Sequence, residues 1–450
     1  MSNPRHLVLN AFLMSVGHHE AAWRLPESDP HASSEVGHYQ QLARIAERGH
    51  LDSVFFADSP SLMTNPARRP AEAIEPTLLL AAMAAVTERI GLIATGSTTY
   101  DEPYNVARRF ASLDAISHGR AGWNVVTSAA EDAGANFGYD TIPGHATRYA
   151  RAQEFLEVVV GLWSGWQPHA VVADKASGVY ADPARIHPLD HHGEHFSVRG
   201  PLNVGRSAQG WPVLVQAGSS PAGIELAARF AEAVFTAQRS LEDGQEFYRT
   251  LKAATARAGR NPEHLKILPG IVPVIGGTEE EALRLERQLD DLMVHEHALH
   301  QLADQIGIPA SEIDLDGPLP DQVRPTDDIQ GNRSRYQLTL EMARTERLTV
   351  RQLLNRLGGG RGHRTFAGTP EQVADSVESW FRNGAADGFN IMPAVLPSGL
   401  EAFVDHVVPL LQERGLFRRE YTGSTLREHY GLPVPDGSGL PGAIAQEVSA

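Results

Sequence analysis

Residues 216–223 (QAGSSPAG) combine small residues, two hydroxyls and a proline in the pattern of a helix start. Backbone N–H groups and hydroxyls at a helix amino terminus bind anions, because the unpaired donors and the helix dipole favour negative charge there. Gly218, Ser219 and Ser220 are therefore candidates for a phosphate site. Ser220, directly before Pro221, is equally suited to cap the helix, so the residues alone leave both roles open.

His145 and Tyr149 lie four residues apart in the string GHATRYARAQEF. If a helix begins there, the two side chains share one face and could reach a ligand phosphate or ring. The alternative is structural, with His145 in a surface loop and the Tyr149 ring packed against a strand.

Several other chemistries are excluded or disfavoured. The chain has no cysteine, so disulfides, thiolate nucleophiles and Cys-ligated metals are absent. The histidines of residues 187–195 are interrupted by Pro188, and residues 295–300 (HEHALH) do not match HExxH. We expect no metal site. The glycines of residues 358–362 lack the Lys-Ser/Thr of a phosphate loop and are interpreted as a hinge.

Charge and hydropathy narrow the class of protein. With 39 basic and 55 acidic residues the formal net charge is −16, which disfavours nucleic acid and anionic lipid as partners. No run approaches the roughly 20 apolar residues that span a bilayer, and the amino terminus lacks a signal-peptide pattern. We expect a cytoplasmic enzyme that acts on a small organic molecule, with no membrane or nucleic-acid partner.

Short apolar runs alternate with helical patterns along the chain, which indicates parallel strands with right-handed crossovers. Eight such runs predict a (β/α)₈ TIM barrel; a doubly wound open sheet is the alternative. The expected strands are residues 6–14, 53–57, 90–96, 122–128, 211–217, 233–237, 267–275 and 388–393.

The active site of such a barrel lies at the carboxyl ends of its strands. The polar residues at the first four ends include His18, His19, Asp58, Ser97 and Asn124. They are mostly uncharged and show no paired carboxylates and no Ser/His/Asp spacing. This set suits a cofactor with many hydrogen-bonding edges better than it suits hydrolysis.

Two stretches break the repeat. We expect residues 1–450 to form a single barrel domain with insertions at about 165–210 and about 295–363 and a C-terminal tail at about 418–450. Structureless segments of this length in a compact domain are usually functional lids or disordered. Both insertions are expected to lie over one end of the barrel, the second as a lid.

The chain resembles the bacterial luciferase-like monooxygenases, in the branch of nitrilotriacetate, dibenzothiophene-sulfone and long-chain alkane monooxygenases. The likeness covers most of residues 5–430. It rests on the combination of AFLMSVGHHEAAWR, LDSVFFADS, GSTTYDEPYNVARRFASLDAISHGRAGWNVVTS, RYARAQEFLEVVVGLW, HGEHFSVRGPLNV, QGWPVLVQAGSSPAG, FAGTPEQVAD and DGFNIMP.

The resemblance implies the barrel with insertions and an FMN site. Asp58 and Ser97 would lie beside the isoalloxazine, with Asn124 under its polar edge. The residues implied to hold the ribityl chain and the 5′-phosphate are His145, Tyr149, Ser219 and Ser220, with Gly218 in the same turn. Barrels more often bind phosphate after strands 7 and 8, so a site after strand 5 rests on the family.

The resemblance further implies an oxygenase that receives FMNH₂ from a separate NAD(P)H-dependent flavin reductase. O₂ would react through a C4a-(hydro)peroxyflavin to oxygenate a small substrate, with C–N or C–S cleavage or hydroxylation. His18 or His19 would hydrogen-bond or protonate the peroxide, because a histidine changes charge near pH 6.5. We expect a homodimer or homotetramer.

Two alternatives keep the fold. One is hydride transfer with the deazaflavin F420, which the quoted segments disfavour. The other is noncatalytic flavin binding, which is associated with truncated barrels, whereas all eight expected strands are present here.

Overall fold

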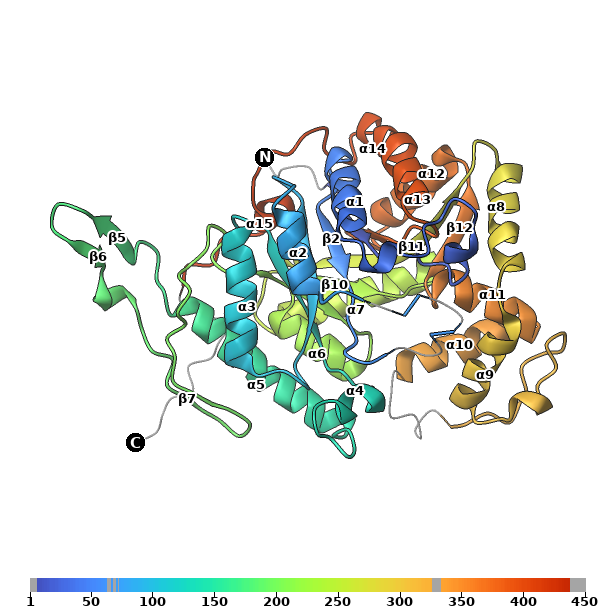
Figure 1. Ribbon diagram of the computed structural model, residues 1–450, viewed down its shortest axis with the longest axis horizontal. Coiled ribbons are helices and arrows are strands. Elements are labelled where there is room, and N and C mark those ends of the chain that lie inside the picture. Colours follow the sequence, from blue (N-terminus) through green and yellow to red (C-terminus); the bar gives the residue numbers. More distant parts are fainter. Residues whose placement is uncertain (1–5, 63–65, 68–69, 72, 326–332, 438–450) are drawn as a thin grey trace.

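The computed structural model describes the chain apart from residues 1–5, 63–65, 68–69, 72, 326–332 and 438–450. A closed ring of parallel strands forms the centre, with helices around it (Figure 1). In order around the ring, the strands are β1 (Val8–Phe12), β2 (Ser53–Phe56), β3 (Gly91–Ser97), β4 (Ala121–Val126), β9 (Val213–Ala217), β10 (Ala233–Thr236), β11 (Lys266–Ile275) and β13 (Gly388–Ile391). Because β13 pairs with β1 and β10 pairs with β11, the ring closes. The predicted barrel is confirmed, and the open sheet is wrong.

Three aromatic rings fill the upper part of the barrel. Phe12, Phe55 and Phe235 come from β1, β2 and β10, with ring centroids 4.5 Å apart for Phe12 and Phe55 and 5.4 Å apart for Phe12 and Phe235. Strand residues alternate between the two faces of a sheet, so their neighbours in sequence face the helices instead. The rings form an apolar layer just below the carboxyl ends of the strands.

Proline and capping residues define many of the helix starts. Pro221 opens α6 after the N-cap Ser220, and Ser240 and Asp243 form a reciprocal capping box at the start of α7. Outside the insertions, the helices are α1 (Val36–Arg48), α2 (Pro76–Ala84), α3 (Pro103–Ile116), α4 (Glu131–Ala135), α5 (His145–Ser164), α6 (Pro221–Phe230), α7 (Leu241–Arg257), α8 (Glu279–Asp291), α12 (Pro370–Arg382), α13 (Ser398–Ala402), α14 (Val408–Glu413) and α15 (Leu426–His429), with a π-helical stretch Phe403–Val407 between α13 and α14. Single 3₁₀ turns occur at Ala22–Arg24, Ala32–Ser34, Pro183–Arg185, Pro262–His264 and Ala310–Glu312. Among the described helices, none has the length and apolarity needed to cross a membrane.

The first insertion consists of two hairpins between α5 and β9. Their strands are β5 (Val171–Asp174) with β6 (Val179–Ala181) and β7 (His191–His192) with β8 (Ser197–Val198). The β5–β6 hairpin extends away from the barrel (Figure 1). Because this insertion joins the end of a helix to the start of a strand, it belongs to the amino-terminal end of the barrel. There the Arg206 guanidinium donates to the Pro435 carbonyl.

The second insertion is helical and has its own core. It contains α9 (His295–Ile306), α10 (Arg333–Thr345) and α11 (Val350–Gly360), which pack together through residues such as Leu302, Leu340 and Leu353. It leads into a ninth strand, β12 (Arg364–Gly368), which pairs with the second half of β11 outside the ring. Gln337 and Leu338 of α10 line the same cleft as the residues that follow the carboxyl ends of β4 and β9, so this insertion lies over the carboxyl-terminal end of the barrel. The expectation that both insertions lie over one end is therefore wrong.

The C-terminal segment closes the other end of the barrel. The Leu426 side chain packs against Gly91 and Gly122 near the starts of β3 and β4, and the Tyr430 hydroxyl donates to Asn10 Oδ1 inside the barrel at 2.9 Å. With its lower end plugged, the barrel is left with one accessible mouth, at the carboxyl ends of its strands.

Candidate functional site

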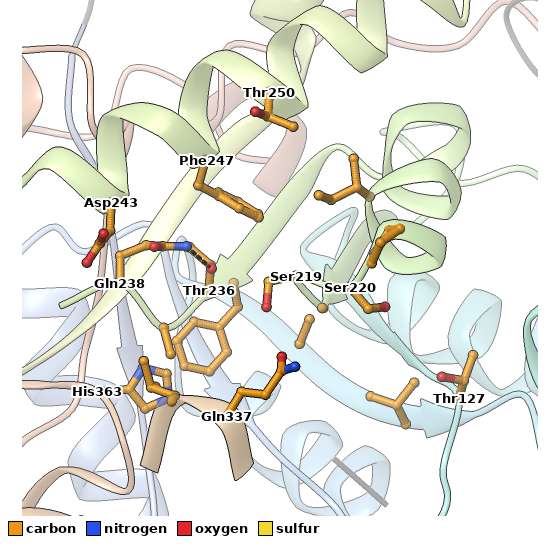
Figure 2. Close-up of a pocket in the computed structure, with 18 of the residues that line it drawn as sticks. Thr127, Ser219, Ser220, Thr236, Gln238, Asp243, Phe247, Thr250, Gln337 and His363 are labelled. Atoms are coloured by element: carbon orange, nitrogen blue, oxygen red, sulfur yellow. Dashed lines mark hydrogen bonds between the residues drawn. The ribbon is translucent and has the colours of Figure 1, made fainter. Parts of the chain in front are cut away.

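A cleft of about 980 Å³ opens at the carboxyl ends of β4, β9 and β10 (Figure 2). Its walls come from the loop after β4, the first turns of α5 and α6, one face of α7, and α10 of the second insertion. The predicted cofactor residues that line it are His145, Tyr149, Gly218, Ser219 and Ser220. The barrel thus brings together two sequence segments, around residues 145 and 219, that are more than seventy positions apart.

Ser220 is the N-cap of α6. Its Oγ accepts the Gly223 N–H at 3.1 Å, so the capping role is confirmed. A hydroxyl that accepts one hydrogen bond keeps its own proton to donate, and Ser219, the preceding residue, is exposed in the cleft. Capping and anion binding are therefore compatible at this helix start.

Helix α5 begins at His145, so His145 and Tyr149 do share a face. Their ring centroids are 4.6 Å apart. The Tyr149 hydroxyl lies 3.3 Å from the position that a Cβ on Gly223 would take, which places it beside the first turn of α6. A hydroxyl, an imidazole and the start of α6 thus face the same part of the cleft.

Asp58, Ser97 and Asn124 lie at or near the carboxyl ends of β2, β3 and β4 but outside the lining of this cleft. The Ser97 hydroxyl accepts the N–H groups of Thr99 and Tyr100, at 3.1 and 3.3 Å, and so fixes the turn after β3.

Asn124 is buried inside the barrel. Its Nδ2 donates to Thr95 Oγ1 at 2.8 Å, while its Oδ1 has no hydrogen-bond partner within the described chain. A buried amide oxygen without a partner costs about 1–3 kcal/mol, so Asn124 Oδ1 is suited to a donor from a ligand. Asp58 is exposed, and its pKa is raised by partial desolvation and then by the neighbouring Glu75.

His18 is fully buried near the mouth of the barrel. Its Nε2 lies 2.8 Å from the Phe12 carbonyl, so this nitrogen carries the proton, and its ring packs edge-on against Phe12. Burial, with the positive charge of Arg361, lowers the pKa of His18 from 6.5 to about 3. His18 therefore stays neutral at physiological pH, and the expected change of charge near pH 6.5 does not hold for it.

The lowered pKa of His18 makes the stability of the folded chain depend on pH. Because the folded-state pKa lies below the unfolded value, the unfolded chain binds the extra proton, and stability is lost as the pH falls from 6.5 towards 3. At pH 5.5 the wild type is expected to lose about 1.4 kcal/mol more unfolding free energy, relative to pH 8, than a His18→Gln variant. Glutamine can keep the bond to the Phe12 carbonyl. Urea unfolding at both pH values measures the difference, and parallel pH profiles for the two proteins would contradict it.

His19 faces away from the main cleft. Its Nδ1 accepts the Ala21 N–H at 3.2 Å and its Nε2 lies 3.4 Å from Asp290 Oδ1. It lines a second cavity of about 260 Å³ together with Glu286 and Arg356. The structure thus separates His18 and His19 from the predicted phosphate residues.

Within the described residues, no group of three or more His, Asp or Glu side chains is arranged to hold a metal ion.

The sequence did not predict some of the residues that line the cleft. Arg148 lies between His145 and Tyr149, is 4% exposed and donates to the Pro143 carbonyl at 2.5 Å. Its position on the same helical turn was a usable signal. Gln337 and His363 come from the second insertion and its end (Figure 2). No periodicity in the sequence indicates where an irregular insertion returns to a barrel.

The comparisons with known proteins agree with this architecture. Residues 18–387 match the family of luciferase-like monooxygenases. The chain is 48% identical to the N-acetyl-S-(2-succino)cysteine monooxygenase of Bacillus subtilis (strain 168), over 96% of this chain and 98% of the relative. It is also 48% identical to the nitrilotriacetate monooxygenase component A of Aminobacter aminovorans, over 95% and 97%. A crystal structure of a riboflavin lyase with modified FMN and riboflavin matches with a TM-score of 0.85, at 32% identity over 97% of this chain and 99% of that chain. The protein with the cleft described above is therefore a member of the luciferase-like monooxygenase family.

Proposed function

We propose that the chain is the oxygenase component of a two-component monooxygenase, which takes FMNH₂ from a separate NAD(P)H-dependent flavin reductase. The observation that carries this proposal is the cleft at the barrel mouth, where Ser219, Ser220 and Tyr149 surround the start of α6. The name component A, borne by the Aminobacter relative, supports a second component. The match to a riboflavin lyase structure with modified FMN supports the choice of flavin.

The residues present fit a phosphorylated flavin. The start of α6 offers backbone N–H groups and the Ser219 and Ser220 hydroxyls to a phosphate, and Tyr149 and His145 offer further polar atoms on the same side. Asn124 Oδ1, buried and unsatisfied among the described residues, offers an acceptor deeper in the barrel. The bound reduced flavin would supply the activation of O₂.

The protein's own contribution is to orient the substrate and to exclude water. The Phe12, Phe55 and Phe235 rings close the barrel below the mouth, and residues of α10 form part of the wall of the cleft. Exclusion of water strengthens the hydrogen bonds inside a site and suppresses side reactions. We infer that the described part of the second insertion, residues 295–325 and 333–363, acts as the lid of this chamber.

The two relatives at 48% identity support a substrate class. Nitrilotriacetate and N-acetyl-S-(2-succino)cysteine, for which those relatives are named, both carry several carboxylates near a C–N or C–S bond. We infer a small carboxylate-bearing substrate that is oxygenated next to its heteroatom, with cleavage of that bond.

Anaerobic titration with FMNH₂ tests the cofactor, and O₂ consumption tests the reaction. The purified chain is expected to bind FMNH₂ with micromolar or tighter affinity and to show no affinity for F420. With a flavin reductase and NADH, it should form product from one of the two carboxylates above. Tight binding of F420 instead of FMNH₂ would favour the hydride-transfer alternative. Flavin binding without any product from a wider substrate panel would favour a noncatalytic flavoprotein.

A further inference from the structure

The glycine-rich end of α11 does not act as the expected hinge. Gly358, Gly359 and Gly360 are buried and belong to the helix. A Cβ on Gly358 would lie 2.4 Å from the Met293 side chain, and one on Gly359 would lie 3.4 Å from His19. These glycines therefore permit close packing of α11 against its neighbours.

A sharp turn follows this helix. Arg361 and Gly362 both have left-handed backbones, with φ values of 50° and 87°, and the His363 N–H donates to the Gly360 carbonyl at 2.8 Å. The next residue, Arg364, pairs with Ile271 as β12 begins. The turn thus sets His363 beside Gly270 of β11, at the mouth of the barrel.

Gly270 leaves the space that the His363 ring occupies. A Cβ at Gly270 would lie 2.5 Å from His363 Nδ1 and 2.8 Å from Met392 Sδ. On its face, the His363 ring stacks on Phe235 with 4.8 Å between centroids and 7° between planes. The imidazole is 9% exposed, and it lines the main cleft. Its position is fixed by the turn, by Gly270 and by Phe235.

We propose that His363 contacts the substrate and determines specificity by hydrogen-bonding one of its carboxylates. This inference rests on the proposed function. The Nδ1 edge faces Gly270, so Nε2, on the opposite edge of the ring, is directed away from that wall. Figure 2 shows His363 at the far side of the cavity from Ser220 and Thr127, with Gln337 between. Ser220 and His363 therefore lie on opposite sides of the cavity. With the flavin phosphate at the start of α6, the substrate would lie next to His363.

Gly270 acts in this proposal as a positioning residue. It does not touch the substrate, but only glycine lets the imidazole lie flat on Phe235 at this point of β11. Gly270 and His363, more than ninety positions apart in the sequence, thus act together at one point of the cleft.

Anaerobic calorimetric titration of FMNH₂-saturated protein with nitrilotriacetate, and with N-acetyl-S-(2-succino)cysteine, tests the proposal without turnover, because O₂ is absent. His363→Phe keeps the stacking on Phe235 and removes the hydrogen bond. It is expected to weaken binding of at least one carboxylate by about tenfold to a hundredfold, which is the range for a hydrogen bond to a charged group. The affinity for FMNH₂ should stay within about twofold.

Gly270→Ala is expected to weaken carboxylate binding in the same way, because the added methyl group displaces the ring. The double variant should bind no more weakly than His363→Phe alone, since both changes remove the same contact. Gly37→Ala, at a helical site where a Cβ meets nothing within 4 Å, is the matched control and should leave both affinities unchanged.

The outcomes separate the two proposals. Failure of the wild type to bind FMNH₂ in the absence of O₂ overturns the proposed function. Normal FMNH₂ binding with unchanged carboxylate affinity in His363→Phe overturns the substrate role, as does wild-type protein that binds FMNH₂ but neither carboxylate. A His363→Phe variant that loses FMNH₂ affinity and keeps carboxylate affinity overturns it as well, by making His363 a cofactor residue.

Discussion

Replacing Ser219 with aspartate is expected to weaken FMN binding by on the order of a hundredfold, while riboflavin binding changes by less than about threefold. A carboxylate placed at the start of α6 would lie against the proposed phosphate position, and two like charges a few ångströms apart near a protein surface repel by several kcal/mol. Riboflavin lacks the phosphate and so escapes this repulsion. Fluorescence titration of the protein with each flavin measures both affinities.

The substitution should not harm the fold. Ser219 is exposed, and an acidic residue near a helix amino terminus interacts favourably with the helix dipole. Ser219→Asn is the matched control, because asparagine has nearly the same shape as aspartate and carries no charge. It is expected to weaken FMN binding by tenfold or less. Equal losses for FMN and riboflavin would instead indicate a distorted flavin ring site, and unchanged FMN affinity would move the phosphate away from α6.

The barrel was predictable because each of its strands has a recognisable sequence pattern. Each of the eight ring strands is a short, buried apolar run flanked by turn residues, and alternation with helices leaves few topologies. The ninth strand, β12, was missed because Arg364 and Thr365 begin it and most of its residues are only partly buried. A strand that lies outside the ring lacks the continuous apolar run that marks the others.

The site was predictable only where it lies on regular elements. Ser219, Ser220, His145 and Tyr149 line the cleft together because helix starts and helical spacing fix where such residues point. Their role as flavin ligands, which the family resemblance implies, stays a prediction. His363 was missed, because its position depends on a turn with two left-handed residues and on one glycine of a distant strand. For His18, the sequence indicated the position near the barrel mouth but not the burial that keeps the ring neutral.

One buried cation, Arg427, anchors the C-terminal segment that closes the barrel. Arg427 of α15 is 1% exposed, and its guanidinium forms an ion pair with both carboxylate oxygens of Glu232, the longer contact being 3.0 Å. It also donates to the carbonyls of Gln209 at 3.1 Å and Trp211 at 3.3 Å. These contacts join the segment that plugs the barrel to the loops before β9 and β10.

Arg427→Ala is accordingly expected to lower the free energy of unfolding by about 3–5 kcal/mol, because it leaves Glu232 and two buried carbonyls without their partner. Denaturant unfolding followed by circular dichroism measures the loss. Arg284→Ala, which removes a solvent-exposed pair with Glu281, is the matched control and should cost less than about 0.5 kcal/mol. Adding Glu232→Gln to Arg427→Ala should restore part of the stability, because the unpaired charge is then gone. Similar losses for the Arg427 and Arg284 variants would show that the segment is held by its apolar side chains, Leu426 and Tyr430, and not by the ion pair.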